Sequence, residues 1–266
     1  MGRAGPYLRM LRAQVRAQTE YRTSFVVDLV ASALATTLDL VTVFVLFRVR
    51  GELGGFGGRE VLLMAGLSTC AFPIADLAVG SIDRLRYYVR SGLFDTVLIR
   101  PLSALGQLVA MDFAPRRVGR VVQGLLVYLI ALSLADVPWT PARVLLAVMT
   151  PLAGAVLFAS LLIAGATVAF WWVESGEIAA SVTYGGKDFA SYPITVYGGL
   201  FRQLFAFGLG FAFVGYLPAL ALLGRSDPLG TPGWLHWCAP LVAALAASGA
   251  LLLWRTGIRH YRSTGS

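Results

Sequence analysis

Residues 81–101, SIDRLRYYVRSGLFDTVLIRP, separate two long apolar segments of the chain and carry four arginines and two aspartates. Apolar residues in the first half recur at the spacing i, i+3, i+7. Charged residues repeat that spacing about 100° further round a helix. The apolar stripe is Ile82, Leu85 and Val89, and the charged stripe is Asp83, Arg86 and Arg90. The pattern therefore predicts a short amphipathic helix.

The flanking residues mark where this helix begins and ends. Ser81 is a suitable N-cap, and Gly92 suits the position that stops a helix. Pro101 suits the first turn of a following helix, which we expect to end where Pro115 forces a break. The stretch therefore predicts two short helices joined by a turn.

The composition of the whole chain indicates a membrane protein. Of the 266 residues, 57% are hydrophobic and 14% are charged, and the mean hydropathy is +0.72. Soluble domains carry about 25% charged residues. A chain this apolar cannot hide its surface in one soluble core, so we expect an all-α integral membrane protein. The net charge of +8 comes from arginines beside apolar segments, which indicates membrane orientation rather than nucleic-acid binding.

Six apolar segments are each near the ~20 residues that cross about 30 Å of hydrocarbon. We place the transmembrane helices at residues 25–47, 60–80, 117–135, 143–173, 199–223 and 238–255. The fourth is too long for one crossing, so it either projects into the cytoplasm or breaks near Pro151. The fifth is ambiguous, because Pro218 can end a shorter span. In that case residues 217–237 form an outer re-entrant segment before the last span.

The distribution of basic residues gives the orientation. Seventeen lie on one side of the predicted spans and five on the other, so the richer side is cytoplasmic and holds both termini. A single lysine among 22 basic residues, with abundant glycine and alanine, suggests a high-GC bacterial genome and a multi-pass protein of the bacterial cytoplasmic (inner) membrane.

Residues 1–266 form one predicted transmembrane domain with two peripheral parts. Residues 1–22 contain an apolar stripe of Leu8, Leu11 and Val15 beside a stripe of arginines, which predicts an interfacial helix on the inner surface. Residues 81–114 are the predicted cytoplasmic coupling region. We interpret its charged helix as the place where a soluble partner grips the membrane domain. The alternative is a solvated loop between two spans.

Several site types are excluded by the residues that they require. A P-loop needs Gly-Lys-Ser/Thr, whereas Lys187 is followed by Asp188. His236 and His260 fall at predicted membrane edges, and two cysteines allow no metal cluster. We therefore expect neither an enzyme nor a metal site, and no cofactor bound by this chain.

Two carboxylates lie within the first predicted span. Asp28 and Asp39 are eleven residues apart, which places them on nearly one face of a helix. A carboxylate near the bilayer centre costs about 2.5–3.5 kcal/mol on insertion scales, so Asp39 should face protein or a wet cavity. The two residues either line a translocation path or take up a proton, or they act as polar helix-packing contacts.

A second polar stretch, residues 184–203, contains three tyrosines and two glycine pairs. Tyrosines are enriched at membrane interfaces, and glycine pairs mark hinges or turns. We expect this stretch to lie on the cytoplasmic side.

The ordered set of short motifs resembles a known family. SGLFDTVLIRPLS at residues 91–103 is similar to the "G-x-x-D…L-x-R-P-L" element of bacterial type-2 ABC transporter permeases. Tyr192-Pro193-Ile194 and GYLPA at residues 215–219 resemble a second signature of the six-span branch, although Gly215 stands where Asn is commoner. Members of that branch are usually encoded as paired permeases with one ATPase.

The resemblance implies a permease subunit of an ATP-driven exporter. Its partners would be a cytoplasmic ABC ATPase dimer, which holds ATP and Mg, and a second permease that is a paralogue or an identical copy, with lipids around both. The loop after the second span would dock on the ATPase. The motif match carries over these positions: Gly92, Asp95, Arg100, Pro101 and Leu102. Asp83, Arg86 and Arg90 join them as ATPase-coupling candidates from helical phase alone.

Three hypotheses follow for the function. The leading one is the ABC exporter permease, moving an amphipathic substrate such as a drug, peptide, lipid or glycolipid. The second is a proton-coupled secondary transporter that uses Asp28 and Asp39. The third is a membrane scaffold or receptor without transport.

Overall fold

The computed structural model describes Tyr7, Met10 and residues 22–262. The predicted interfacial helix at residues 1–22 lies almost wholly outside the described residues. The side chains of Asp28 and Asp39 also lie outside them, although the backbone of both belongs to a helix.

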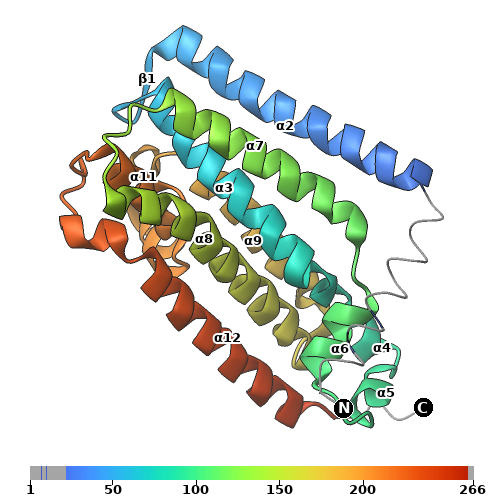
Figure 1. Cartoon of the computed structure of the whole chain (residues 1–266). Helices are drawn as coiled ribbons and strands as arrows, with labels where there is room; N and C mark the ends of the chain where they lie inside the picture. Colours follow the sequence, from blue (N-terminus) through green and yellow to red (C-terminus); the bar gives the residue numbers. More distant parts are fainter. Residues whose placement is uncertain (1–6, 8–9, 11–21, 263–266) are drawn as a thin grey trace.

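Long helices run side by side between two ends of the molecule (Figure 1). The hairpin end holds the two short antiparallel strands β1 (Glu52–Leu53) and β2 (Phe56–Gly57). The opposite end, the α4–α6 end, holds three short helices. These are α4 (Leu85–Arg90), α5 (Phe94–Leu98) and α6 (Ala104–Met111). The helices between the ends are α2 (Arg22–Arg50), α3 (Gly58–Val79), α7 (Val118–Leu134), α8 (Pro141–Thr167), α9 (Gly176–Ala190) and α12 (Ala239–His260).

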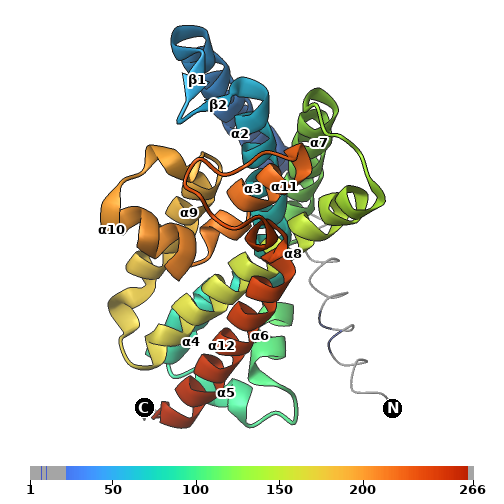
Figure 2. The ribbon, with the colours of Figure 1, turned by 90° about the vertical axis from the view of Figure 1, so that its left-hand side faces the viewer.

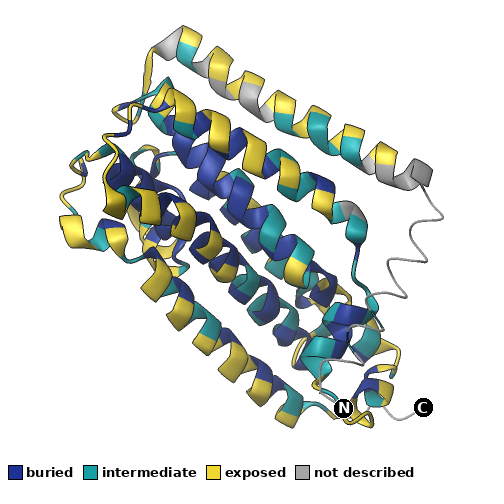
Figure 3. Ribbon diagram, in the orientation of Figure 1, coloured by how far each residue is buried: buried dark blue, intermediate teal, exposed yellow. Residues whose placement is uncertain are grey.

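Among the described residues, three helical runs are each long and apolar enough to cross a membrane: Gly58–Arg90, Pro141–Phe170 and Ala239–His260. Apolar helices α2 and α7 accompany them. Figure 3 shows that buried residues concentrate on α3 and the facing sides of its neighbours, whereas α2 and α12 expose most of their outer surface. The large exposed apolar side chains are Val, Leu and Phe on α2 and Leu on α12, as expected for surfaces that meet hydrocarbon. The all-α membrane class is therefore confirmed.

The bundle is held together by close helix approach and a few buried hydrogen bonds. At Gly124 of α7, an added Cβ would overlap the carbonyl oxygen of Thr69 on α3, so only glycine permits this approach. The Tyr128 hydroxyl donates to the Ala147 carbonyl across 2.8 Å and joins α7 to α8. Small residues and polar bridges of this kind are how membrane helices associate.

The fourth predicted span does not break at Pro151. Helix α8 continues through this buried proline, and a 3₁₀ turn at Val168–Phe170 extends it at the α4–α6 end. A proline inside a membrane helix costs one backbone hydrogen bond, and packed neighbours compensate for that loss. The expectation that this span breaks near Pro151 is therefore wrong.

The fifth segment between the ends is α9, not residues 199–223. Gly176, the first residue of α9, lies against the Arg86 side chain at the α4–α6 end. In the last turn of α9, the Lys187 carbonyl accepts a 2.8 Å hydrogen bond from Ser68, in the middle of α3. Within the following 3₁₀ turn, Ile194–Val196, the Thr195 hydroxyl donates to the Gly54 carbonyl at the hairpin end, also at 2.8 Å. Residues 184–203 thus run from the level of Ser68 to the hairpin end, so the two stretches that we expected on one side, 81–114 and 184–203, do not lie at the same end of the molecule.

Residues 199–223 form a bent segment instead (Figure 2). Its first arm is α10 (Gly199–Arg202) with a π-helical turn at Gln203–Gly208. Its second arm is a 3₁₀ turn at Phe211–Phe213 with α11 (Tyr216–Leu223), and the arms are inclined by 59°. Gly210 makes the bend with φ of 82°, a conformation that glycine adopts without strain.

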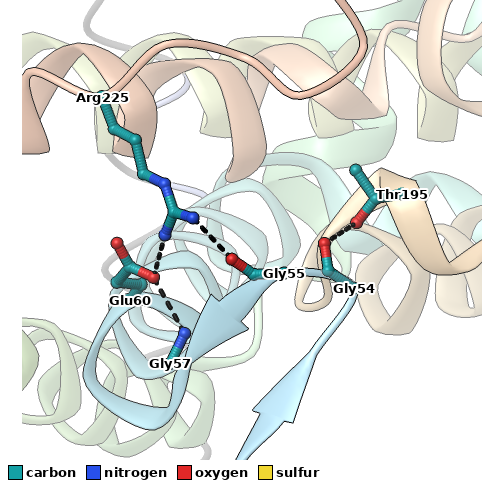
Figure 4. A network of polar contacts seen from close by, with 6 residues as sticks. All are labelled: Gly54, Gly55, Gly57, Glu60, Thr195 and Arg225. Carbon is teal, nitrogen blue, oxygen red and sulfur yellow. Dashed lines mark hydrogen bonds and ion pairs between the residues drawn. The ribbon is translucent and has the colours of Figure 1, made fainter.

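Both arms of the bent segment are fastened at the hairpin end, so the segment enters and leaves on one side. Thr195 precedes the first arm, and Arg225 follows the second and bonds to Gly55 and to Glu60 (Figure 4). A bent segment that begins and ends at the hairpin end therefore precedes the last helix, at residues 199–223 rather than at 217–237. Pro218 does not end a helix, because it lies in the first turn of α11, where no amide donor is needed.

We predict opposite effects for two glycine substitutions in the membrane helices. Gly124→Ala should lower the free energy of unfolding by about 1–3 kcal/mol, because the added methyl group forces α3 and α7 apart. Gly249→Ala in α12 has nothing within 4 Å of the added methyl group and should be neutral or stabilising by up to about 1 kcal/mol. Unfolding in mixed micelles measures both. Equal losses in the two variants would contradict the packing described here.

Candidate functional site

The candidate site is built on an extension of α3. A 3₁₀ turn at Gly80–Arg84 leads from α3 directly into α4, and residues 58–90 count as one helical run of 33 residues. The prediction of a separate helix with Ser81 as N-cap is therefore wrong. The buried Ser81 hydroxyl instead donates to the Val109 carbonyl at 3.2 Å and ties the turn to α6. Because α4 is continuous with α3, a force on α4 acts on a helix that reaches the hairpin end.

The two stripes predicted for this segment are confirmed. Ile82, Leu85 and Val89 are buried against the end of the bundle. On the other face, Asp83, Arg86 and Arg90 are exposed. A helix anchored by one face and charged on the other presents a fixed array of charges to the outside.

Ion pairs lie at both ends of α4. Arg90 lies 3.0 Å from Glu174, in the 3₁₀ turn Val173–Ser175 that precedes α9. Arg84 lies 2.5 Å from Asp112, and the Tyr88 hydroxyl donates to the same carboxylate at 3.1 Å. The pair of Arg90 and Glu174 is largely exposed, so it contributes little to stability, about 0–1 kcal/mol. Its effect is to link α4 with the start of α9.

Helix α5 is anchored by an aromatic cluster. Gly92 stops α4 with φ of 72°, and α5 then buries Phe94 and Val97. The Phe94 ring lies 5.2 Å from Phe170, at the end of α8, and 5.0 Å from Tyr261, which follows α12. These ring pairs fasten α5 to two of the long helices at once.

Asp95 of α5 also faces the end of α12. Burial and the neighbouring Asp95 carboxylate raise the pKa of the Tyr261 hydroxyl. A carboxylate beside a phenol disfavours the ionised form of the phenol, so the shift places Asp95 close to Tyr261. Asp95 thus contacts the bundle from half-buried surroundings rather than pointing freely outward.

Hydrogen bonds from the Gln107 side chain hold the loop between α5 and α6. Buried Gln107 donates to the carbonyl groups of Val97 and Leu102, at 3.0 Å and 3.1 Å. Ser103 caps α6 by accepting from the Gly106 amide, which confirms a separate helix between Pro101 and Pro115. The Ser103 amide in turn donates to the Tyr7 hydroxyl at 2.9 Å.

What this framework exposes is an apolar patch rimmed by charge, which we call the α4–α6 surface. Ile99, at the tip of the loop, is 83% exposed, and Arg100 and Pro101 beside it are exposed as well. The remaining exposed members are Asp83, Arg86, Tyr87, Arg90, Leu93 and Leu98. An exposed apolar patch with a polar rim is typical of a protein–protein contact.

The structure brings most of the predicted site residues to this surface. Of the motif positions, Gly92 shapes the turn, Asp95 and Leu102 are half-buried, and Arg100 and Pro101 face outward. Asp28 and Asp39 lie elsewhere, within α2, and their side chains are outside the described part of the chain.

The sequence reasoning missed a polar face on α9. Glu177, Ser181, Tyr184 and Asp188 recur at helical spacing and are all exposed, while Thr183 and Phe189 on the other face are buried. Since Lys187 lies level with the middle of α3, this polar face reaches the middle of the bundle. The signal was the 3.6-residue spacing of polar residues over 177–188, which the glycine pair Gly185-Gly186 obscured.

Within residues 22–262, no three His, Cys, Asp or Glu side chains come together to hold a metal ion.

A family model described as "ABC-2 family transporter protein" matches residues 33–265. The match covers the whole α4–α6 surface, α9 and the bent segment. Neither a curated protein nor a solved structure matches the chain.

Two substitutions compare the stability contributed by a buried residue of α5 with that contributed by an exposed residue of its loop. Phe94→Ala leaves a cavity between Phe170 and Tyr261 and should cost about 3–5 kcal/mol of unfolding free energy. Ile99→Ala removes a side chain that is 83% exposed and should change stability by no more than about 0.5 kcal/mol. Thermal unfolding in detergent measures both. A stable Phe94→Ala variant would show that α5 is not anchored as described.

Proposed function

The chain belongs to the ABC-2 transporter family and is a membrane permease component of an ABC transporter, and we propose that it couples ATP hydrolysis by a separate ATPase to export of an amphipathic substrate. The observation that carries this proposal is the α4–α6 surface. It combines an exposed apolar tip at Ile99 with fixed charges, and it is fastened rigidly to three long helices.

In this proposal the chain crosses the membrane six times. The crossings are α2, α3, α7, α8, α9 with its following turn, and α12, and the α4–α6 end faces the cytoplasm. The bent segment at 199–223 enters from the outer side and returns to it. Support comes from the alternating direction of these helices and from the basic residues that cluster at the α4–α6 end.

A cytoplasmic ABC ATPase dimer would engage the α4–α6 surface and hold ATP and Mg. Two permeases, identical or paralogous, would form the membrane part in the inner membrane of a bacterium. Movement of the ATPase subunits would be passed to α3 through α4, and to α8 and α12 through Phe94. A rigid element that contacts its partner differently in two states is what such coupling requires.

The substrate path would run along α9. Its exposed polar face extends to mid-depth of an otherwise apolar bundle, and polar groups at that depth need water or protein around them. Asp28 and Asp39 on α2 would then serve as polar helix-packing contacts.

Docking is tested by a double substitution at the loop tip. Ile99→Asp with Arg100→Glu puts negative charge into the apolar contact and reverses the rim charge. We expect at least about tenfold weaker binding of the ATPase encoded beside this chain. Co-purification of the two proteins measures this. The matched control is Arg59→Glu at the hairpin end, which should bind as wild type. Equal binding by all three proteins would contradict docking at the α4–α6 surface.

The energy source is tested by transport in vesicles that contain the assembled transporter. We expect transport of a fluorescent amphipathic probe to require ATP and to survive collapse of the proton gradient. Asp39→Asn should leave transport intact, whereas Asp188→Leu on α9 should slow it, because it removes charge from the proposed path. Transport by this chain without the ATPase, abolished by Asp39→Asn, would instead establish a proton-coupled secondary transporter.

A further inference from the structure

An apolar groove lies at the hairpin end between α2, α3 and α7. Its volume is about 380 Å³, within the roughly 300–1,000 Å³ typical of ligand sites. The apolar lining comes from Phe44 and Phe47 of α2, Leu62 of α3, and Val127 and Ile130 of α7. The groove therefore offers an acyl chain a place between helices rather than against one of them.

A polar pocket of about 620 Å³ adjoins the groove. Gly58 and Arg59 line both cavities, so Arg59 stands at their junction. The polar pocket contains two acids and two bases. Glu60 and Arg225 are bonded to each other and to the backbone of the β1–β2 hairpin (Figure 4). The Arg225 guanidinium also lies 4.5 Å from the centroid of the Phe56 ring. These two residues are held in the fold.

The second pair of charges is held much more loosely. Arg59 and Asp136 lie 3.3 Å apart, and their side chains are 69% and 92% exposed. An ion pair this exposed contributes little by itself, so either partner can be re-paired with a ligand at small cost. A positive and a negative group side by side match a head group that carries both charges.

We propose that this double cavity binds one bilayer phospholipid with a zwitterionic head group. One acyl chain fills the groove between α2 and α7, the phosphate meets Arg59, and the ammonium meets Asp136. A purely anionic head group would place its charge beside Asp136 without compensation. This lipid site is separate from the proposed transport path and stands whether or not the chain exports a substrate.

Native mass spectrometry of the full-length chain, stripped of lipid in detergent, tests the site. Phosphatidylethanolamine and phosphatidylglycerol with the same acyl chains are titrated in parallel. We expect one phosphatidylethanolamine per chain, bound at least about tenfold more tightly than phosphatidylglycerol, since only the former satisfies both charges. Asp136→Asn should remove this preference but keep lipid binding, and Arg59→Gln should weaken both lipids.

A matched pair of variants on α7 tests the groove itself. Ile130→Trp fills the groove and should weaken both lipids at least about tenfold, whereas Leu125→Trp, on an exposed face outside the groove, should bind as wild type. Equal affinity of the wild type for the two lipids would overturn the zwitterionic assignment. Unchanged lipid binding by Ile130→Trp would overturn the site. If Ile130→Trp altered only self-association of the chain, the groove would be a contact between two copies and the proposal would fail.

Discussion

The packing of Phe94 against Phe170 and Tyr261 is the contact on which the proposed coupling depends. Alone, α5 is five residues long, too short to be stable in water. With Phe94 buried, the helix becomes part of the ends of α8 and α12, and the loop at Ile99 acquires a fixed position. The continuity of α3 into α4 gives the same surface a third attachment. A soft loop would absorb the motion of a partner, whereas this anchored unit can pass it on.

The opposite end is closed by a different set of contacts. Arg225 joins the chain after the bent segment to the β1–β2 hairpin, and Thr195 joins the end of the α9 segment to the same hairpin (Figure 4). Opening a path on that side would require these hydrogen bonds to break or shift. Apolar packing of Phe94 therefore anchors the α4–α6 end, whereas hydrogen bonds of Thr195 and Arg225 close the hairpin end.

Sequence reasoning was reliable where one physical signal dominated. The phase of Ile82, Leu85 and Val89 located the buried face of α4, and uninterrupted apolar runs located α3, α7 and α12. It failed for α9, because polar residues and Gly185-Gly186 make residues 176–190 resemble a surface loop. Burial of its other face against α3 and α8, which no local pattern reveals, decides its position. The same limit applies to the bent segment, where Gly210 rather than Pro218 sets the turn.

The most direct test of the central claim is site-specific photo-crosslinking in the assembled transporter. A photoreactive residue at position 99 should form an adduct with the nucleotide-binding subunit, because Ile99 is the exposed tip of the α4–α6 surface. The same residue at position 234, exposed at the hairpin end, should form none. Absence of the adduct at position 99, or an equal yield at position 234, would contradict the account.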